Sequence, residues 1–291
     1  MDAGLQSSGL EEPTPMRRAL ILGSAATLCL SLTACPKDNG EPVTNSEAAL
    51  AIEESTLSSR AQELTSSSVE IATNFTLGGA VSAAVTEIKN FIATQLPCAD
   101  IVLANNTLTI TYGAKPGVCI YRGHTYSGQH VVTVLRTDSN DVEVDHQWKD
   151  LSNGVLKVNG TAQVTWSFSA ASRRVKHDVV WTRISDARTG HGTGDETQKT
   201  LTGGIAEGIR VDGTRAWDGQ NGHWDLGING VEWRWIDPVP QAGNYTLAMP
   251  NKKNLTLAFA RVDDTRIRVT LTSGDRTFTF VVAKTGQITG S

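Results

Sequence analysis

The 291-residue sequence lacks the short motifs that mark common catalytic and metal sites. Its six histidines form no HExxH, HxH or HxxxH pair, no serine lies in a GxSxG motif, and no glycine-rich loop precedes a lysine as in a phosphate-binding loop. We therefore expect no metal and no cofactor, and a binding or structural role is favoured over catalysis. The paired acids of a glycoside hydrolase stay open, because distant strands supply them without a local motif.

The sequence also lacks a large excess of charge of either sign. Lys and Arg number 26 against 30 Asp and Glu, a net charge of −4. A weakly acidic chain has no field that would gather nucleic acid or anionic lipid, so we expect no nucleic-acid partner. Any contact with a membrane is then expected to come from a covalent anchor alone.

Long apolar runs are scarce, and the run at residues 19–30 is interrupted by serine and threonine. A transmembrane helix needs about 20 apolar residues, so this run is too short to span a bilayer. Arg17 and Arg18 precede it, and the small-residue sequence LTAC at 32–35 follows it. A basic start, a short apolar stretch and a small-residue cleavage site are the parts of an export signal.

Residues 16–35 resemble the signal peptide of a bacterial lipoprotein, whose lipobox ends in the cysteine that receives the lipid. The resemblance implies cleavage before Cys35 and attachment of acyl chains such as palmitate to that residue. Residues 1–15 are acidic and unlike an export signal, so we expect translation to begin at Met16. The resemblance implies a lipid-anchored protein of the cell envelope. Pro36 is not an acidic retention signal, which favours the outer membrane over the inner.

Cysteine is scarce as well, and one pair remains in the exported chain. Of the four cysteines, Cys29 leaves with the signal and Cys35 takes the lipid, which leaves Cys98 and Cys119. An envelope compartment permits disulfides, and no histidine or third cysteine lies nearby at zinc-ligand spacing. We therefore predict a Cys98–Cys119 disulfide, which stabilises the fold by about 3 kcal/mol.

The residues from 98 onward are rich in alternating apolar and polar positions, as in the stretch from Val164 to Phe168. Turn dipeptides separate these stretches, and four of them are Asn-Gly, at 153–154, 159–160, 221–222 and 229–230. Asn-Gly is typical of tight hairpins, and one-sided alternation is typical of antiparallel sheet. We predict a mostly β fold, a meander of about twelve strands that forms a curled sheet, a sandwich or a partial barrel.

Helices are predicted before the β region. Residues 47–64 are good helix formers with Ser46 as N-cap, and residues 79–95 carry apolar residues at i, i+3 and i+4 until Pro97 ends the pattern. The predicted organisation is a signal peptide at 1–34, a tether at 35–46, a helical segment at 47–97 and an antiparallel β domain at 98–291.

Candidate site residues in the β region are few. His191 and Asp195 lie in a glycine-rich stretch that we interpret as a solvated hairpin loop, although such a loop could aim both at a metal or substrate. His223 and Asp225 are two residues apart and therefore share one face of a strand. The sequence Asp263-Asp264 is interpreted as a turn between strands.

The seven tryptophans are the most distinctive residues of the β region. Trp166, Trp233 and Trp235 keep step with the alternation of their strands, which predicts core packing. The other four are less regular, and Trp217 and Trp224 flank a turn. Together with His223 and Asp225, these two tryptophans are the expected ligand surface, because exposed rings would bind a sugar or the apolar surface of a partner.

These observations favour an exported, lipid-anchored envelope protein with a binding or structural role. Its expected partners are the membrane, through the lipid, and a glycan, a lipid or an envelope protein. One alternative is a carrier of lipid or lipoprotein, which requires a continuous apolar pocket of acyl-chain size in a half-barrel. The other is a polysaccharide hydrolase, which requires two carboxylates facing each other within about 10 Å.

Overall fold

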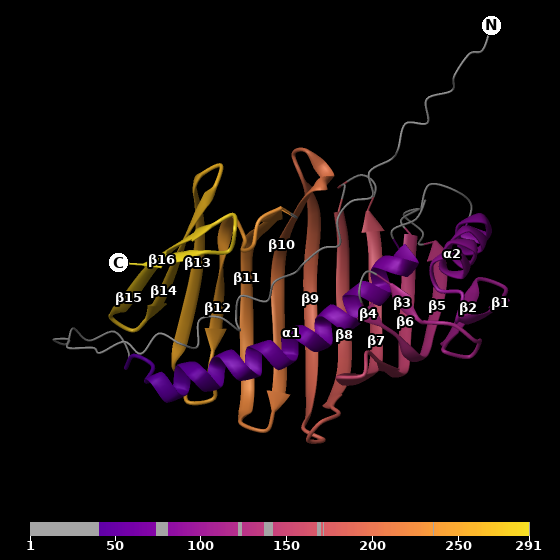
Figure 1. Ribbon diagram of the computed structural model, residues 1–291, viewed down its shortest axis with the longest axis horizontal. Helices are drawn as coiled ribbons and strands as arrows, with labels where there is room; N and C mark the ends of the chain where they lie inside the picture. Colours follow the sequence, from indigo (N-terminus) through magenta and orange to yellow (C-terminus); the bar gives the residue numbers. More distant parts are fainter. Residues whose placement is uncertain are drawn as a thin grey trace, which may run out of the picture.

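The computed structural model describes residues 41–73, 81–121, 124–136, 142–167, 170, 172–234 and 236–290. Within them, helices α1 (Asn45–Thr73) and α2 (Val81–Gln95) precede one antiparallel sheet of 14 strands (Figure 1). Mostly antiparallel β structure behind an N-terminal helical segment is thus confirmed. Cys35 and the rest of the predicted signal, and Trp235, lie outside the described residues.

The strands of the sheet follow chain order, each antiparallel to its neighbours. They are β1 (Asp100–Ala104), β2 (Thr107–Tyr112), β5 (Ser127–Arg136), β6 (Val142–Ser152), β7 (Leu156–Ser167), β8 (Ser172–Arg183), β9 (Thr189–Leu201), β10 (Gly204–Gly219), β11 (Gly222–Arg234), β12 (Ala242–Ala248), β13 (Asn254–Asp263), β14 (Arg266–Ser273), β15 (Arg276–Ala283) and β16 (Ile288–Gly290). A separate ribbon pairs β3 (Ile120–Tyr121) with β4 (His124–Thr125).

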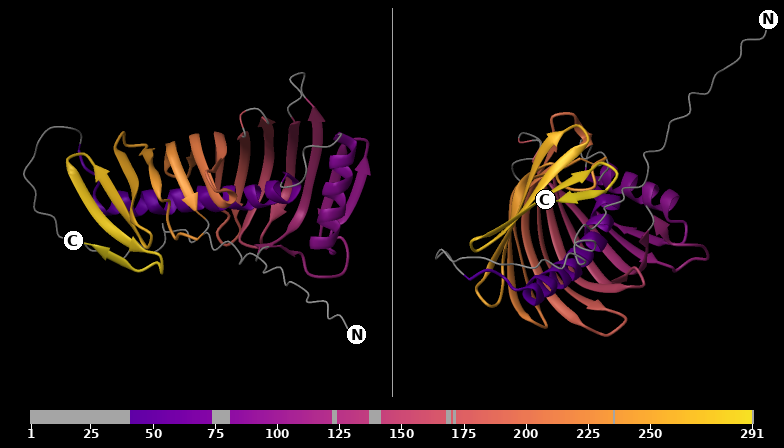
Figure 2. Two further views of the ribbon diagram at one scale, coloured as in Figure 1. Left: turned by 90° about the horizontal axis from the view of Figure 1, so that it is seen from above. Right: turned by 60° about the vertical axis from the view of Figure 1, so that its left-hand side comes forward.

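The sheet is open, with β1 and β16 at its two edges. Of the three forms that the sequence left open, the curled sheet is the one observed. The sheet curls toward α1, which lies along the concave face and crosses most of the strands (Figure 2). α2 lies at the β1 end of the molecule, and its Val85, Ile88 and Ile92 belong to the same buried cluster as Leu108 and Ile110 of β2.

α1 begins earlier and ends later than predicted. Thr44 Oγ1 accepts a hydrogen bond from the backbone N–H of Glu47 (3.3 Å), and Glu47 Oε2 accepts one from the N–H of Thr44 (2.7 Å). This reciprocal capping box makes Thr44 the N-cap, in place of Ser46. The helix continues past residue 64, and there the hydroxyls of Thr65 and Ser68 donate hydrogen bonds to helix carbonyls, so these polar groups are satisfied within the helix.

Two of the four predicted Asn-Gly hairpins are wrong. Asn153-Gly154 and Asn221-Gly222 do form the turns between β6 and β7 and between β10 and β11. The other two dipeptides lie inside strands, at Gly160 of β7 and Gly230 of β11, where the pairing registers shift. A positive φ serves a β-bulge as well as a turn, which is why the dipeptide alone was ambiguous. The turn predicted at Asp263-Asp264 lies one residue later, because Asp263 ends β13 and Asp264 and Thr265 form the turn before β14.

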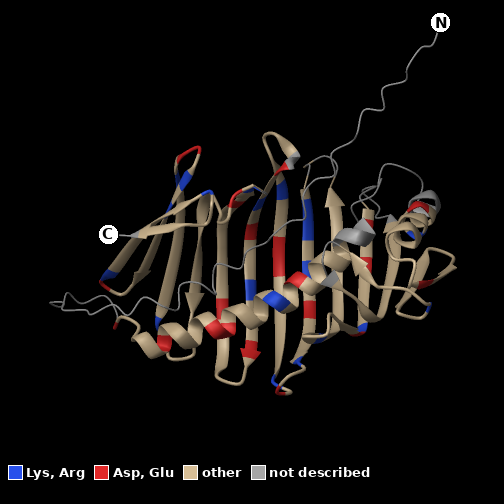
Figure 3. Cartoon of the chain, viewed as in Figure 1, with Lys and Arg blue, Asp and Glu red and all other residues tan. Residues whose placement is uncertain are grey.

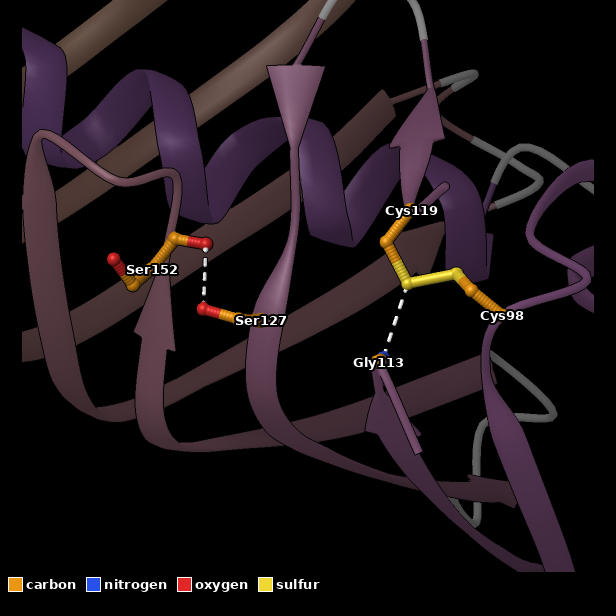
Figure 4. The surroundings of a disulfide bond; sticks show 5 residues. All are labelled: Cys98, Gly113, Cys119, Ser127 and Ser152. Atoms are coloured by element: carbon orange, nitrogen blue, oxygen red, sulfur yellow. Dashed lines mark hydrogen bonds between the residues drawn. A yellow bond between two sulfur atoms is a disulfide. The ribbon is translucent and has the colours of Figure 1, made fainter. Parts of the chain in front are cut away.

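The predicted disulfide joins Cys98 and Cys119, with Cα atoms 5.4 Å apart. Cys119 Sγ also accepts a hydrogen bond from the N–H of Gly113, at 3.1 Å (Figure 4). Both half-cystines belong to the buried cluster beneath α2. The disulfide therefore fixes the irregular segment between β2 and β3 onto the core.

Candidate functional site

The two faces of the sheet are covered differently. α1 follows the concave face, and its hydrogen bonds reach from Lys253, before β13, to Trp148 on β6. The described residues place no helix on the convex face (Figure 2). The predicted site residues divide between the two faces.

Trp217 of β10 and Trp224 of β11 form a directly opposed cross-strand pair on the concave face. Their rings lie parallel, with centroids 6.1 Å apart and an interplanar angle of 3°. They are only 2% and 0% exposed, and they form one buried cluster with Ala51 of α1 and with Leu247 and Met249. The two rings thus pack beneath α1.

The prediction of one exposed ligand surface is therefore wrong. His223 and Asp225 point to the convex face, because successive residues of a strand point to opposite faces. Both are exposed, whereas Trp217 and Trp224 are covered by a helix far earlier in the chain. Since that contact is long-range, the turn sequence could not reveal it.

Burial of the other tryptophans also departs from the prediction. Trp166 and Trp233, which we predicted to be core residues, pack against buried clusters but remain half-buried. Trp148 and Trp181, which showed no regular pattern, are each 1% exposed. The most deeply buried tryptophans of the concave face lie where α1 covers it. Coverage by the helix therefore determines their burial more than the apolar-polar alternation of the strands does.

Glu54 of α1 is fully buried and forms an ion pair with Arg188, in the turn between β8 and β9. Asn221, in the turn between β10 and β11, donates a hydrogen bond to the same carboxylate at 2.7 Å. Gly219 packs against it so closely that a Cβ would lie 2.7 Å from Glu54 Oε2. Glu53, which is half exposed, contacts Arg188 from the solvent side. Two hairpin turns thus hold the N-terminal half of α1.

Polar side chains also join the middle of α1 to β9 and β10. Arg215 donates a hydrogen bond to Ser58 Oγ (2.7 Å), and Gln62 donates one to Glu196 Oε1 (2.8 Å). Burial lowers the pKa of Arg215, and the charge of Glu196 opposes that shift. His177 lines the same region, and burial lowers its pKa to about 4. The gap left between helix and sheet here is about 20 Å³, room for one water molecule.

Toward its C-terminal end, α1 meets a buried stack of aromatic rings. Trp148 donates a hydrogen bond to Ser68 Oγ (2.8 Å) and stacks on His130 and His146. The two imidazoles are hydrogen-bonded to each other at 2.9 Å, and the Tyr112 hydroxyl lies 3.4 Å from His130 Nδ1. Burial lowers the pKa of both histidines, to about 3 for His146. Two neutral rings that hydrogen-bond each other serve packing here.

On the convex face, His223 lies between two aspartates. Its Nδ1 is 2.8 Å from Asp218 and its Nε2 is 3.3 Å from Asp225. The hydrogen bond to Asp218 is the main cause that raises the pKa of His223. The predicted shared face of His223 and Asp225 is confirmed. All three side chains are more than half exposed, so water screens the group.

His191 and Asp195 also lie on the convex face, but the loop predicted for them is wrong. Residues 189–201 form strand β9, whose glycines alternate with polar residues. His191 bonds Asp178 at 2.6 Å, and Asp195 pairs with Arg174. A shallow hollow of about 370 Å³ lies beside Asp195 against β9, β10 and β11. Each side chain is thus bound to a neighbouring strand and is not directed jointly at one point.

The first described residues are bound to the far end of the sheet. The N–H of Val43 donates to Ser273 Oγ (3.0 Å), and Lys253 Nζ donates to the carbonyl of Pro42 (3.2 Å). Lys253 also pairs with Glu47 at 2.9 Å. The hydrogen bond from Thr44 N–H, together with Lys253, lowers the pKa of Glu47 to about 2. The segment that enters α1 is therefore fixed beside β13 and β14.

An acyl-chain carrier would need an open apolar pocket on the concave face. In this structure α1 and the side chains of the sheet fill that space. Ligand pockets usually exceed about 300 Å³, whereas the gap beside Gln62 measures about 20 Å³. The buried carboxylates on this face, Glu54 and Glu196, hydrogen-bond to Arg188 and Gln62 respectively. They are held by these partners and do not line an open cleft.

The fold and site define an open, curled antiparallel sheet with a polar helix bound along its concave face. Neither helix in the described ranges is long and apolar enough to cross a membrane. Among the same residues, no group of His, Cys, Asp and Glu is arranged to hold a metal ion. No protein-family model, curated protein or solved structure matches the chain.

The sequence pattern did not reveal the residues that hold α1, among them Glu54, Arg188, Glu196 and Arg215. The one available signal was Glu54 itself, a charge on the same helical face as the apolar Ala51 and Leu57. Charged residues are almost never fully buried without a partner. The position of Glu54 on this apolar face therefore indicates a buried cation that pairs with its carboxylate. Which cation could not be read, because Arg188 is far away in sequence.

Proposed function

We propose that this protein is an exported, lipid-anchored protein of the bacterial envelope whose curled sheet serves as a binding or structural platform. The signal-like residues 16–35 support export and lipid attachment at Cys35. The Cys98–Cys119 disulfide supports an oxidising compartment. The outer membrane is the proposed site, because Pro36 follows the lipidated cysteine.

The connection between anchor and sheet carries the proposal. Cys35 lies only seven positions before Pro42, which is already bonded to Lys253. From there α1 is held to the sheet at Glu47, Glu54, Ser58 and further along. A force on the lipid would therefore pass through α1 into most of the strands. This attachment of α1 to the sheet suits a platform held at a membrane surface.

The occupied concave face leaves the convex face and the two ends of the sheet for partners. A glycan or an envelope protein remains the proposed partner class beside the membrane itself. The filled concave face favours a platform over a carrier of acyl chains. Glu54 and Glu196 are hydrogen-bonded to side chains of the same protein, and this favours a platform over a hydrolase.

Mass spectrometry of the protein from its native envelope tests the proposal. We expect an N-terminal peptide that begins at Cys35 and carries the mass of a lipid. Cys35→Ser should abolish the lipid and release the protein from membranes, whereas Cys29→Ser, within the signal, should leave both unchanged. An unmodified Cys35 thiol, with the preceding apolar stretch still attached, contradicts the proposal.

A further inference from the structure

Charge is distributed unevenly along the sheet. Residues 252–291, which form β13 to β16 and their turns, contain seven Lys and Arg but three Asp and Glu. The remaining residues contain 19 Lys and Arg against 27 Asp and Glu. The weakly acidic chain thus has one end, at β13–β16, where Lys and Arg outnumber Asp and Glu (Figure 3). We call residues 252–291 the basic end.

Three of the seven cations of the basic end are both unpaired and exposed. Lys253, Arg261 and Arg266 pair with carboxylates. The other four have no carboxylate partner among the described residues; they are Lys252, Arg268, Arg276 and Lys284. Lys252, Arg268 and Lys284 are exposed. These cations outnumber the two acids of this end that form no ion pair in the described part of the chain, Asp264 and Asp275.

The basic end also bears apolar side chains that α1 does not cover. Its buried cluster, around Phe259 and Val269, contains no residue of α1. Beside this cluster, Phe278 and Phe280 remain half-buried. Near the ends of their strands, Val262 of β13 is 42% exposed and Ile288 of β16 is 40% exposed. Unpaired cations and exposed apolar side chains at the same end of a molecule are the composition of a surface that binds anionic lipid.

The predicted lipid lies close to this end of the sheet. Pro42 and Val43 are bonded to Lys253 and Ser273, between β12 and β15. Seven residues span at most about 25 Å, so Cys35 cannot lie farther than that from the basic end. Fourteen strands at their usual spacing extend over about 60 Å, so β1 lies well beyond this reach.

We infer that the basic end is a membrane-contacting surface that binds an anionic lipid surface, with the β1 end directed away from it. The inference rests on the proposed lipid anchor at Cys35. It also revises the expectation that membrane contact comes from the anchor alone, because the net charge of the whole chain conceals the local excess of cations at the basic end. Each Lys or Arg near an anionic surface strengthens binding by about five-fold.

Energy transfer from the protein to a membrane-bound acceptor tests this orientation. The native lipidated protein is reconstituted into phosphatidylcholine vesicles that contain an acceptor-labelled lipid, with or without phosphatidylglycerol. A donor dye is placed at Thr285→Cys, in the turn before β16, or at Val102→Cys, on the exposed β1 edge. On anionic vesicles we expect several-fold greater transfer from position 285 than from position 102.

Substitution of Arg268 and Lys284 by Gln removes two exposed cations from the basic end. The preference for position 285 should then fall to its value on pure phosphatidylcholine. Lys149→Gln, an exposed position on β6, is the matched control and should preserve the preference. Equal transfer from both positions in a protein whose Cys35 carries lipid overturns the orientation alone. Absence of lipid on Cys35 overturns the proposed function, and the orientation with it.

Discussion

Three glycines of β9 face the concave side of the sheet at alternate positions, Gly190, Gly192 and Gly194. A Cβ on Gly190 would lie 2.1 Å from the Trp181 ring, and one on Gly194 would lie 2.2 Å from His177. The missing side chains thus let two rings from β8 lie flat on the neighbouring strand. We interpreted this glycine-rich stretch as a loop, because glycine is more often a turn residue than a space for a ring.

Substitution of Gly190 by Ala tests this packing. The added methyl group would meet the Trp181 ring, so we expect the free energy of unfolding to fall by about 1–3 kcal/mol, as for other overpacked sites. Gly192→Ala is the matched control, since its Cβ would meet only ordinary contacts at 3.8 Å. Urea unfolding of both variants measures the difference. Equal stability of the two would show that Trp181 does not lie against Gly190.

The buried histidines predict acid sensitivity. His130 and His146 have lowered pKa values in the folded protein, so between about pH 6.5 and pH 4 the unfolded chain binds protons that the folded protein does not. Stability therefore falls as pH falls through this window, by about 1.4 kcal/mol per pH unit for each histidine. The exposed His223, whose pKa is raised, opposes this only weakly.

Urea unfolding at a series of pH values in this window measures the slope. His146→Gln should reduce the slope by about one histidine's share. A free energy of unfolding that stays constant from neutral pH to pH 5 would mean that the two rings are not buried as neutral groups.

At the scale of elements, α1 is the part of the fold that the sequence predicted least well. α2 has a clear apolar face, and its predicted limits differ from the observed ones by two residues at most. α1 instead buries Glu54, Ser58 and Ser68 against the sheet, so its pattern resembles that of a solvated helix. A helix whose buried contacts are polar cannot be paired with its sheet by apolar periodicity alone.

The alternation of apolar and polar residues predicted the sheet well, because a strand with one solvent-exposed face repeats this pattern every two residues. The same alternation could not predict which stretch of the concave face α1 covers. Trp217 and Trp224 were therefore expected at the surface, although Ala51 packs with them. The residues that hold α1 come from turns and strands far apart in sequence, such as Asn221 and Glu196, and only the fold brings them together.

Glu54→Gln tests the hold of the sheet on α1. It removes the buried carboxylate and leaves Arg188 without its closest ion partner, so we expect a loss of about 3 kcal/mol in stability. Glu53→Gln changes the exposed partner of the same arginine and should cost less than about 1 kcal/mol. Hydrogen exchange should accelerate in residues 45–58 of the first variant only. Similar effects of both substitutions would contradict the buried pair.

At the scale of the whole molecule, two features were not predicted. The signal-like segment, the β class and the disulfide pair follow from short stretches of sequence. The curl of the sheet around α1 depends on how distant segments are placed, whereas the basic end is a contiguous stretch of sequence, residues 252–291. Net charge sums cations and acids over the whole chain, and from that sum we expected no contact with anionic lipid. The sum conceals the seven Lys and Arg that lie at one end.

The central claim is that α1 joins the N-terminal segment to the β13 end of the sheet. A zero-length carbodiimide crosslink tests it directly, because Lys253 Nζ lies 2.9 Å from Glu47 Oε2 across 206 residues of sequence. We predict a Glu47–Lys253 crosslinked peptide by mass spectrometry, together with Lys115–Asp100 as an internal positive control. Formation of the control crosslink without the Glu47–Lys253 product would contradict the account.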